Sequence, residues 1–449
     1  MGKEKYGKSD TVDAVYENSE FTNKNPFIEA MPKLMGKIEF EKKIESYPPL
    51  PYNLLEMSRE KRREQVLLIN ELFVPMNYMY EVYDFLYRGI CLNYKTKNTT
   101  DYVKKINILY HSRSAEKEVG EFYTTQSFSG AILGVPGIGK TSTIRRSLSL
   151  IPQVISHEQY AGELFYCKQI VYLVVECPHD CSVKTLAYSI IAEIDKATGS
   201  DYLNRLFSPD GISSSSLAIK VKIICLNNHV GIIVIDEIQN AIRTARKNRQ
   251  ERPLIKFLVE LTNEGCVSLC FTGTLDADDL FGREEHLMRR TEGYRLLPLK
   301  RNRTFYDFLE KIWPYQMTIK KAEFNERMVN CIYDYSKGIP SYVIKIFQET
   351  QIQAILSGEE IISESMIKYV ANKSHITPCE FYQEGTSISD FFSLDSAETK
   401  ELYKSRVGRP ITSRDQDDLI VILNSTSNVN QFIEKLKEEK LIEFLGGII

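Results

Sequence analysis

The stretch GVPGIGKT occupies residues 134–141 and decides the fold expected for this chain. It fits the pattern G-x-x-x-x-G-K-[ST], and it stands between an apolar strand predicted over 129–133 and a helix predicted over 141–150. Glycine lets backbone N–H groups close around a phosphate, and the helix N-terminus adds its dipole. The stretch therefore predicts a nucleotide-binding loop made of Gly134, Pro136, Gly137, Ile138, Gly139, Lys140, Thr141 and Ser142.

Within this loop, Lys140 is expected to reach the β- and γ-phosphates of ATP, and Thr141 to bind Mg²⁺. A second signal is IIVIDEIQ over 232–239, in which four apolar residues place Asp236 at the carboxyl end of a buried strand. Ligands of open α/β sheets bind at that edge. Asp236 is predicted to hold Mg²⁺ and Glu237 to deprotonate the attacking water. The alternative is an ordinary helix start, where acidic residues favour the helix dipole.

Two weaker signals follow the DE pair. The stretch CFTGT over 270–274 ends a predicted strand in Thr272, which could hydrogen-bond the γ-phosphate or the lytic water, although threonine also caps strands and helices locally. The stretch LMRRTEGYRLLPL over 287–299 carries Arg289 and Arg290, either of which could reach the γ-phosphate of a neighbouring subunit. A solvated basic pair is the alternative for these arginines.

Apolar strands alternate with helices from about residue 106 to 300. Unbroken apolar strands between helices predict an α/β fold with a parallel sheet covered on both faces. The predicted strands are 129–133, 169–175, 231–235, 266–271 and 294–299, and the helices between them are 141–150, 183–197, 213–227 and 253–263. Four helices then follow at 304–313, 325–336, 341–356 and 363–371, as a small helical lid.

The rest of the chain flanks this core. Residues 1–60 have little periodicity and are predicted to be an extended arm, and 58–92 a helix that Pro75 interrupts. The predicted units are an N-terminal arm and helical extension (1–105), the core (106–300), the lid (301–375) and a C-terminal extension that binds a partner (376–449).

Charge and composition exclude several classes of protein. The 57 Lys and Arg residues nearly cancel the 60 Asp and Glu residues, for a net charge of -3, so a globally basic nucleic-acid binder is excluded but a local basic surface is not. No run of 18 apolar residues and no secretory signal occurs, so neither a membrane span nor export is expected. Nine scattered cysteines favour a reduced cytosolic location.

The order of P-loop, DE-ended strand, polar-ended strand, arginine pair and helical lid resembles the AAA+ P-loop NTPases. Three further stretches resemble the transposition regulator ATPases of the TnsC/TniB type, among them the regulators of heteromeric transposons: NPFIEAMP over 25–32, VECPHDCSVKTL over 175–186 and the lid segment from 338 to 363. One departure is the lid sequence GIPSYV, where Ser341 or Tyr342 stands in place of the usual lid arginine and Lys345 is a weak substitute.

The resemblance implies an ATPase with ATP and Mg²⁺ as ligands and a role related to that of the phage activator MuB. Such proteins form ATP-dependent rings or helical filaments on double-stranded DNA without sequence preference. They link a target-selection protein to the transposase, and hydrolysis controls assembly or disassembly. A DNA-associated place in the bacterial cytosol is implied as well.

DNA contacts need cations directed at phosphates, and two stretches qualify. The first is SVKT over 182–185, with Lys184 and Thr185 as candidates. The second is IRTARKNRQERP over 242–253, with Arg243, Arg246 and Lys247 as candidates. A solvated helix or loop is the alternative reading for each. Two other functions stay open: a nucleotide-switched signalling or defence NTPase without DNA binding, and an AAA+ initiator or helicase loader.

Overall fold

The computed structural model describes residues 11–17, 24–95, 97, 128–178, 182–206, 214–249, 251–262, 267–277 and 291–373. The chain divides into two units, Met1–Thr377 and Pro378–Ile449. The second unit, and with it the predicted C-terminal extension, lies outside the described residues. The domain boundaries expected at 105, 300 and 375 stay predictions.

Five parallel strands form the central sheet, as the apolar runs predict. Their order across the sheet is β5-β6-β7-β2-β8, so β2 lies between strands that follow it in sequence. Every described residue of β2, β6 and β7 is buried, which accounts for runs without polar alternation. The strands are β2 (Ser129–Gly134), β5 (Tyr172–Glu176), β6 (Ile232–Asp236), β7 (Ser268–Gly273) and β8 (Thr291–Leu296).

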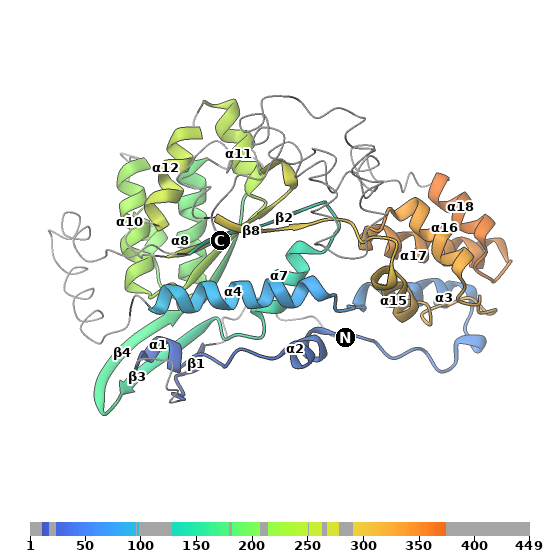
Figure 1. Ribbon diagram of the computed structural model, residues 1–449, viewed down its shortest axis with the longest axis horizontal. Helices are drawn as coiled ribbons and strands as arrows, with labels where there is room; N and C mark the ends of the chain where they lie inside the picture. The colour runs from blue at the N-terminus through green and yellow to red at the C-terminus, as the bar shows by residue number, and fades with distance from the viewer. Residues whose placement is uncertain are drawn as a thin grey trace, which may run out of the picture. The chain divides into compact units, whose positions relative to one another are not determined.

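Helices cover both faces of this sheet (Figure 1). One face carries α4 (Asn77–Lys95) and α7 (Lys140–Leu148), which contact each other and β2. The other carries α8 (Val183–Thr198), α10 (Ser214–Asn227), α11 (Ile238–Lys247) and α12 (Glu251–Thr262). Helix α4 approaches β7 closely at Gly89, whose carbonyl accepts a hydrogen bond from the Ser268 hydroxyl at 3.0 Å. A Cβ at Gly89 would lie 2.7 Å from the Phe128 ring, so this crossing requires glycine.

The strand register brings the carboxyl ends of the strands to one edge. Gly134 pairs with Leu296, and Asp236 pairs with Glu176. Ile235 pairs with Phe271, which places Thr272 at the level of Asp236 on the neighbouring strand. The predicted nucleotide residues therefore share the edge where ligands of such sheets bind.

The strand predicted over 169–175 is wrong as a single element. The chain belongs to β4 (Glu163–Ile170) up to Ile170, and to β5 from Tyr172 onward. Strand β4 pairs antiparallel with β3 (Val154–Tyr160), which also pairs with β1 (Thr11–Asp13) in a second, three-stranded sheet. Both halves of QIVYLVV are largely buried, so a continuous apolar run spans two strands of different sheets without a break in pattern.

The expectation of an extended arm is wrong for the described part of residues 24–60. This part forms α1 (Pro26–Glu29), α2 (Lys37–Ile44) and η1 (Leu54–Glu56). Asn25 caps α1 by accepting from the N–H groups of Phe27 and Ile28, and its amide donates to the Tyr94 carbonyl at 2.8 Å. Phe27 is fully buried against the rings of Tyr94 and the second sheet. The NPF stretch thus docks the N-terminal segment onto the core.

The helix predicted over 58–92 is interrupted as expected. It consists of α3 (Arg59–Gln65), η2 (Val66–Glu71) and, after Pro75, α4. Helix α3 and η2 pack on the lid helix α17, whereas α4 packs on the core. The four lid helices agree with the predicted ones: α15 (Arg303–Ile312), α16 (Glu326–Ser336), α17 (Pro340–Ser357) and α18 (Glu364–Lys373).

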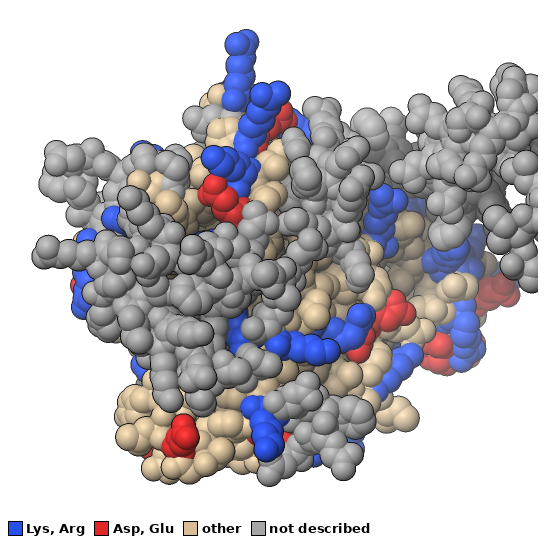
Figure 2. Space-filling model, turned by 60° about the vertical axis from the view of Figure 1, so that its left-hand side comes forward, with Lys and Arg blue, Asp and Glu red and all other residues tan. Residues whose placement is uncertain are grey.

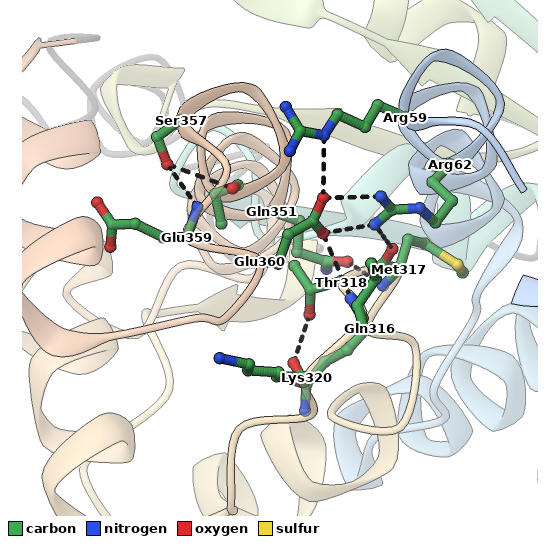
Figure 3. Close-up of polar contacts among 12 residues, drawn as sticks. Arg59, Arg62, Gln316, Met317, Thr318, Lys320, Gln351, Ser357, Glu359 and Glu360 are labelled. Atoms are coloured by element: carbon green, nitrogen blue, oxygen red, sulfur yellow. Dashed lines mark hydrogen bonds and ion pairs between the residues drawn. The ribbon is translucent and has the colours of Figure 1, made fainter. Parts of the chain in front are cut away.

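A buried ion pair joins α3 to the lid (Figure 3). Arg62 donates to both carboxylate oxygens of Glu360, at 2.5 and 2.7 Å, and Arg59 lies 3.6 Å from the same carboxylate. Glu360 also accepts from the Ile319 N–H at 3.4 Å. Helix α3 is thereby connected to the helical lid.

No helix among the described residues is long and apolar enough to cross a membrane.

Candidate functional site

The P-loop takes the conformation that its glycines permit. Between β2 and α7, Gly137 has φ +83° and Gly139 has φ +98°, both in the left-handed region that residues with a Cβ rarely adopt. Gly139 is the N-cap of α7 and provides no side-chain cap. The first N–H groups of α7 therefore face the loop, with Pro136, Gly137 and Ser142 exposed and Ile138 buried beneath them.

Lys140 is the cation of this loop and is nearly buried. Its Nζ donates to the carbonyls of Gly134 at 2.8 Å and Val135 at 3.1 Å. Burial lowers the pKa of Lys140, and the nearby carboxylates of Glu237 and Asp236 act in the opposite direction. The ammonium is therefore a desolvated donor held against the backbone of the loop, and its contact with the phosphates of ATP stays a prediction.

The two predicted magnesium ligands meet although they are 95 residues apart. The Thr141 hydroxyl donates to Asp236 Oδ2 at 2.9 Å, and Asp236 Oδ1 accepts from the Glu237 N–H at 2.9 Å. A hydroxyl and a carboxylate next to an anion-binding loop are the oxygen ligands that Mg²⁺ uses together with substrate phosphates. The residues present thus fit ATP and Mg²⁺, and Thr141 and Asp236 are the side chains that would hold the metal.

Glu237 is the N-cap of helix α11, and both its backbone conformation and its side-chain contact are well defined. Its φ is +56°, which is uncommon for a residue with a side chain, and its carboxylate does not cap the helix. Instead, Oε2 accepts a hydrogen bond from Gln239 Nε2. The interpretation as an ordinary helix start and the predicted site role are therefore both consistent with its position, because Glu237 stands at a helix N-terminus and beside Asp236.

Thr272 lies within β7 and is completely buried. Its Oγ1 has no hydrogen-bond partner among the described residues, nor does Oγ1 of Thr274. A buried hydroxyl without a partner is uncommon, and here it stands at the level of Asp236. This position is consistent with the predicted sensing role of Thr272.

Comparison with known proteins finds one protein family whose model matches the segment that carries this site. The model of a family described as AAA domain matches residues 125–281, which include the P-loop, Asp236, Glu237 and Thr272. This segment of the chain, residues 125–281, is thus similar to the AAA domain family. Its fold is that of the AAA+ P-loop NTPases, with the parallel five-stranded sheet flanked by helices. No protein with a curated description matches the sequence significantly.

Solved structures with similarity to the chain include a Walker-type ATPase of Pyrococcus abyssi, with 14% identity, a TM-score of 0.37 and coverage of 76% of this chain and 83% of that one. The ORC2 protein of Aeropyrum pernix has 14% identity and a TM-score of 0.37, with 76% and 86% covered. Drosophila ORC bound to DNA has 13% identity and a TM-score of 0.40, with 89% and 88% covered.

The P-loop is contacted both by residues that precede the segment 125–281 and by residues that follow it. The Tyr78 hydroxyl, at the start of α4, donates to the Ile138 carbonyl at 2.8 Å. From the lid, the Ser341 N–H donates to the Gly137 carbonyl at 3.2 Å. A Cβ on Gly137 would lie 2.0 Å from Ser341 Oγ. Ser341 thus lies against the P-loop, while Tyr342 and Lys345 follow it on the first turns of α17.

Two residues that contact Glu237 or the P-loop, Gln239 and Tyr78, were not predicted as site residues from the sequence. In the sequence, Gln239 stands in DEIQ, two residues after Glu237. The structure shows that it is buried near the start of α11, and a polar amide so close to Glu237 is the signal that could have identified it. Tyr78 has no comparable signal, because its contact with the P-loop spans 60 residues. Arg289 and Arg290, in contrast, were assigned from sequence but lie outside the described residues.

The DNA-contact candidates occupy two helix ends. The Thr185 N–H and hydroxyl both bond to Ser182, the N-cap of α8, so local capping accounts for Thr185, and Lys184 is the exposed cation there. Arg246 and Lys247 stand in the last turn of α11, and Arg243 one turn earlier. Arg246 pairs with Glu251 at 2.9 Å. Figure 2 shows Lys and Arg side chains projecting at the top of the view, where α11 and α12 lie.

Proposed function

We propose that this protein is an ATP-dependent, DNA-binding regulator of transposition. In this proposal it oligomerises on target double-stranded DNA and connects a target-selection protein to the transposase subunits, and ATP hydrolysis controls assembly or disassembly. The observation that carries the ATPase part is the meeting of Lys140, Thr141, Asp236 and Glu237 at one sheet edge. The transposition role is supported by the resemblance of the NPF, CPHDCSVK and lid stretches to the TnsC/TniB type.

The chemistry proposed for the site follows from these side chains. Lys140 and the N-terminus of α7 hold the phosphates of ATP, and Thr141 with Asp236 holds Mg²⁺. The metal, when bound, neutralises charge that develops on the transferred phosphoryl group. Glu237 accepts the proton of the attacking water, Thr272 senses the γ-phosphate, and Arg289 or Arg290 acts on the site of a neighbouring subunit.

The proposed DNA surface is the far end of α11, together with Lys184. Residues 243–256 contain six basic residues and one acidic residue, a local charge of +5 in a chain whose net charge is -3. Glu237 is the N-cap of helix α11, and the last turn of the helix carries Arg246 and Lys247, so the proposed catalytic base and the proposed phosphate contacts stand at opposite ends of one helix. Repetition of this surface in an oligomer would give cumulative, salt-sensitive affinity for a duplex.

The test is assembly on DNA as a function of nucleotide. Wild-type protein, linear double-stranded DNA and a non-hydrolysable ATP analogue are expected to give rings or filaments in electron micrographs, and ATP to give transient ones. Glu237→Gln should keep ATP binding and trap the assembled state, while Lys140→Ala should prevent binding and assembly.

Two outcomes would contradict the proposal. Nucleotide binding without DNA affinity at any salt concentration would favour a signalling or defence NTPase. Assemblies of Glu237→Gln that dissolve in ATP as fast as those of wild type would contradict Glu237 as the base.

A further inference from the structure

We propose that Gln239 positions Glu237 for proton abstraction and couples it to the end of strand β7. This inference rests on the proposed ATPase function and adds a residue to it. Gln239 is buried, at the second position of α11, and its two amide atoms contact different elements. Nε2 donates to Glu237 Oε2, and Oε1 accepts from the Thr274 N–H at 3.2 Å.

The orientation of this amide is fixed by the chemistry of its partners. A backbone N–H can only donate, so the oxygen of Gln239 must face Thr274. An ionised carboxylate can only accept, so the NH₂ group must face Glu237. A flipped amide would place oxygen against oxygen and N–H against N–H. Gln239 therefore has one orientation that satisfies both partners, and that orientation supplies a donor to the charged form of Glu237.

The space for this bridge is provided by Gly273. A Cβ at position 273 would lie 2.4 Å from Gln239 Oε1 and 3.1 Å from Ile238 Cγ2. Any larger residue there would push the Gln239 amide away from the Thr274 N–H. The end of β7 and the start of α11 are thus complementary at Gly273, which ties Gln239 to the same strand that carries Thr272.

The bridge has a direct consequence for a base at position 237. The Glu237 carboxylate makes no cap with α11, and Gln239 is the one side chain among the described residues that donates to it. Because Oε2 already accepts from Gln239, Oε1 is the oxygen with both acceptor positions open to a water. A shift of the end of β7 would move the Thr274 N–H, and with it Gln239 and Glu237. Gln239 is therefore a positioning residue between the strand of Thr272 and the base.

The first experiment uses full-length Gln239→Met, which keeps the length of the side chain and removes both hydrogen bonds. The kcat for ATP hydrolysis should fall by about 10- to 100-fold through misplacement of the base. The KM and the Kd for a fluorescent ATP analogue should stay within about twofold, because the bridge does not involve the P-loop. In nucleotide-free protein, hydrogen exchange at the Thr274 amide should accelerate by about two- to tenfold.

The matched control is Gln351→Met in the lid. Gln351 is also a buried glutamine whose Oε1 accepts a backbone N–H, from Met317 at 2.7 Å. This variant removes the matching bond from a backbone N–H to the amide oxygen, but in the lid and without a bond to Glu237, so its kcat should equal that of wild type. A second route uses Gly273→Ala, which should lower kcat in the wild-type background but by much less in Gln239→Ala, where only the 3.1 Å contact with Ile238 remains.

The outcomes separate this inference from the proposed function. A wild-type protein that binds but never hydrolyses ATP would overturn the ATPase proposal, whatever the exchange at Thr274. An active wild type with unchanged kcat in Gln239→Met would overturn the role of Gln239 alone. A parallel loss of nucleotide affinity would do so as well, since it would indicate a structural role.

Discussion

At the scale of single residues, burial of the His157 side chain should make the free energy of unfolding depend on pH in the acid range. Its side chain is completely buried, Nδ1 lies 2.7 Å from the Tyr16 hydroxyl and Nε2 lies 2.8 Å from Gln169 Oε1. The amide of Gln169 also donates to the Phe27 carbonyl at 3.0 Å. The ring of His157 therefore stands between the second sheet and the docked NPF stretch, and any change in its charge acts on that contact.

Burial lowers the pKa of His157 from 6.5 to about 4. Between these pH values the unfolded chain binds a proton more readily than the folded one, so the free energy of unfolding should fall as pH falls from 6.5 towards 4. The loss amounts to about 3 kcal/mol for one group. Urea unfolding at several pH values measures it.

The His157→Gln variant provides the comparison, because an amide can bond to both neighbours without titrating. Its unfolding free energy should depend less on pH over this range than that of wild type. Buried His229, whose pKa is also lowered by burial, to about 3, would contribute to the remaining slope, together with Glu360. Identical slopes for the two proteins would show that His157 does not titrate with folding.

At the scale of elements, the ion pair between α3 and the lid is the contact with the largest expected cost of disruption. Arg62 and Glu360 are both buried, and two hydrogen bonds join the guanidinium to the carboxylate. Those bonds lower the pKa of Glu360, so the pair stabilises the fold above pH 4.5 and loses this contribution as pH falls. The pair matters because η2 and α3 pack on α17 while α4 packs beside the P-loop.

Arg62→Met should lower the free energy of unfolding by about 3 to 5 kcal/mol, because it leaves the Glu360 carboxylate buried without its partner. The double variant Arg62→Met/Glu360→Met should lose less than the sum of the two single variants. Chemical unfolding of the four proteins measures the coupling. Lys43→Met, which removes an exposed pair with Glu39, should change stability by less than about 1 kcal/mol. Strict additivity of Arg62 and Glu360 would mean that they do not act as a pair.

At the scale of the whole molecule, the distribution of charge decides how a near-neutral chain could bind DNA. Two cations of α11, Arg246 and Lys247, stand in its last turn, and so do Lys42 and Lys43 in α2. Each double substitution therefore removes two positive charges, from different elements. They allow a specific surface to be separated from general electrostatic attraction.

Arg246→Ala/Lys247→Ala should weaken binding to double-stranded DNA and reduce the slope of log K against log salt by about 2. The control Lys42→Ala/Lys43→Ala should leave that slope unchanged. Titrations of labelled duplex at several salt concentrations, with an ATP analogue present, give both slopes. Equal slopes for the two double variants would exclude the end of α11 as the phosphate-binding surface.

Much of the central fold follows from local patterns. The P-loop, the end of β6 at Asp236 and the four lid helices were all predicted, because glycine spacing, apolar runs and helical periodicity are properties of consecutive residues. The meeting of Thr141 with Asp236 could also be inferred, since parallel strands bring their carboxyl ends to one edge.

Other features depend on contacts between distant segments, which leave no periodic trace in the sequence. The run QIVYLVV belongs to two sheets because hydrogen bonding to β3 and to β6, rather than its own composition, divides it. Phe27 is a core residue because Tyr94 and the second sheet enclose it. The nucleotide loop and the parallel sheet can be predicted from consecutive residues, because they depend on local backbone and burial requirements. The bridge that Gln239 makes from Glu237 to Thr274, and the pair of Arg62 with Glu360, form only on folding, because partners 35 and 298 residues apart meet only after packing.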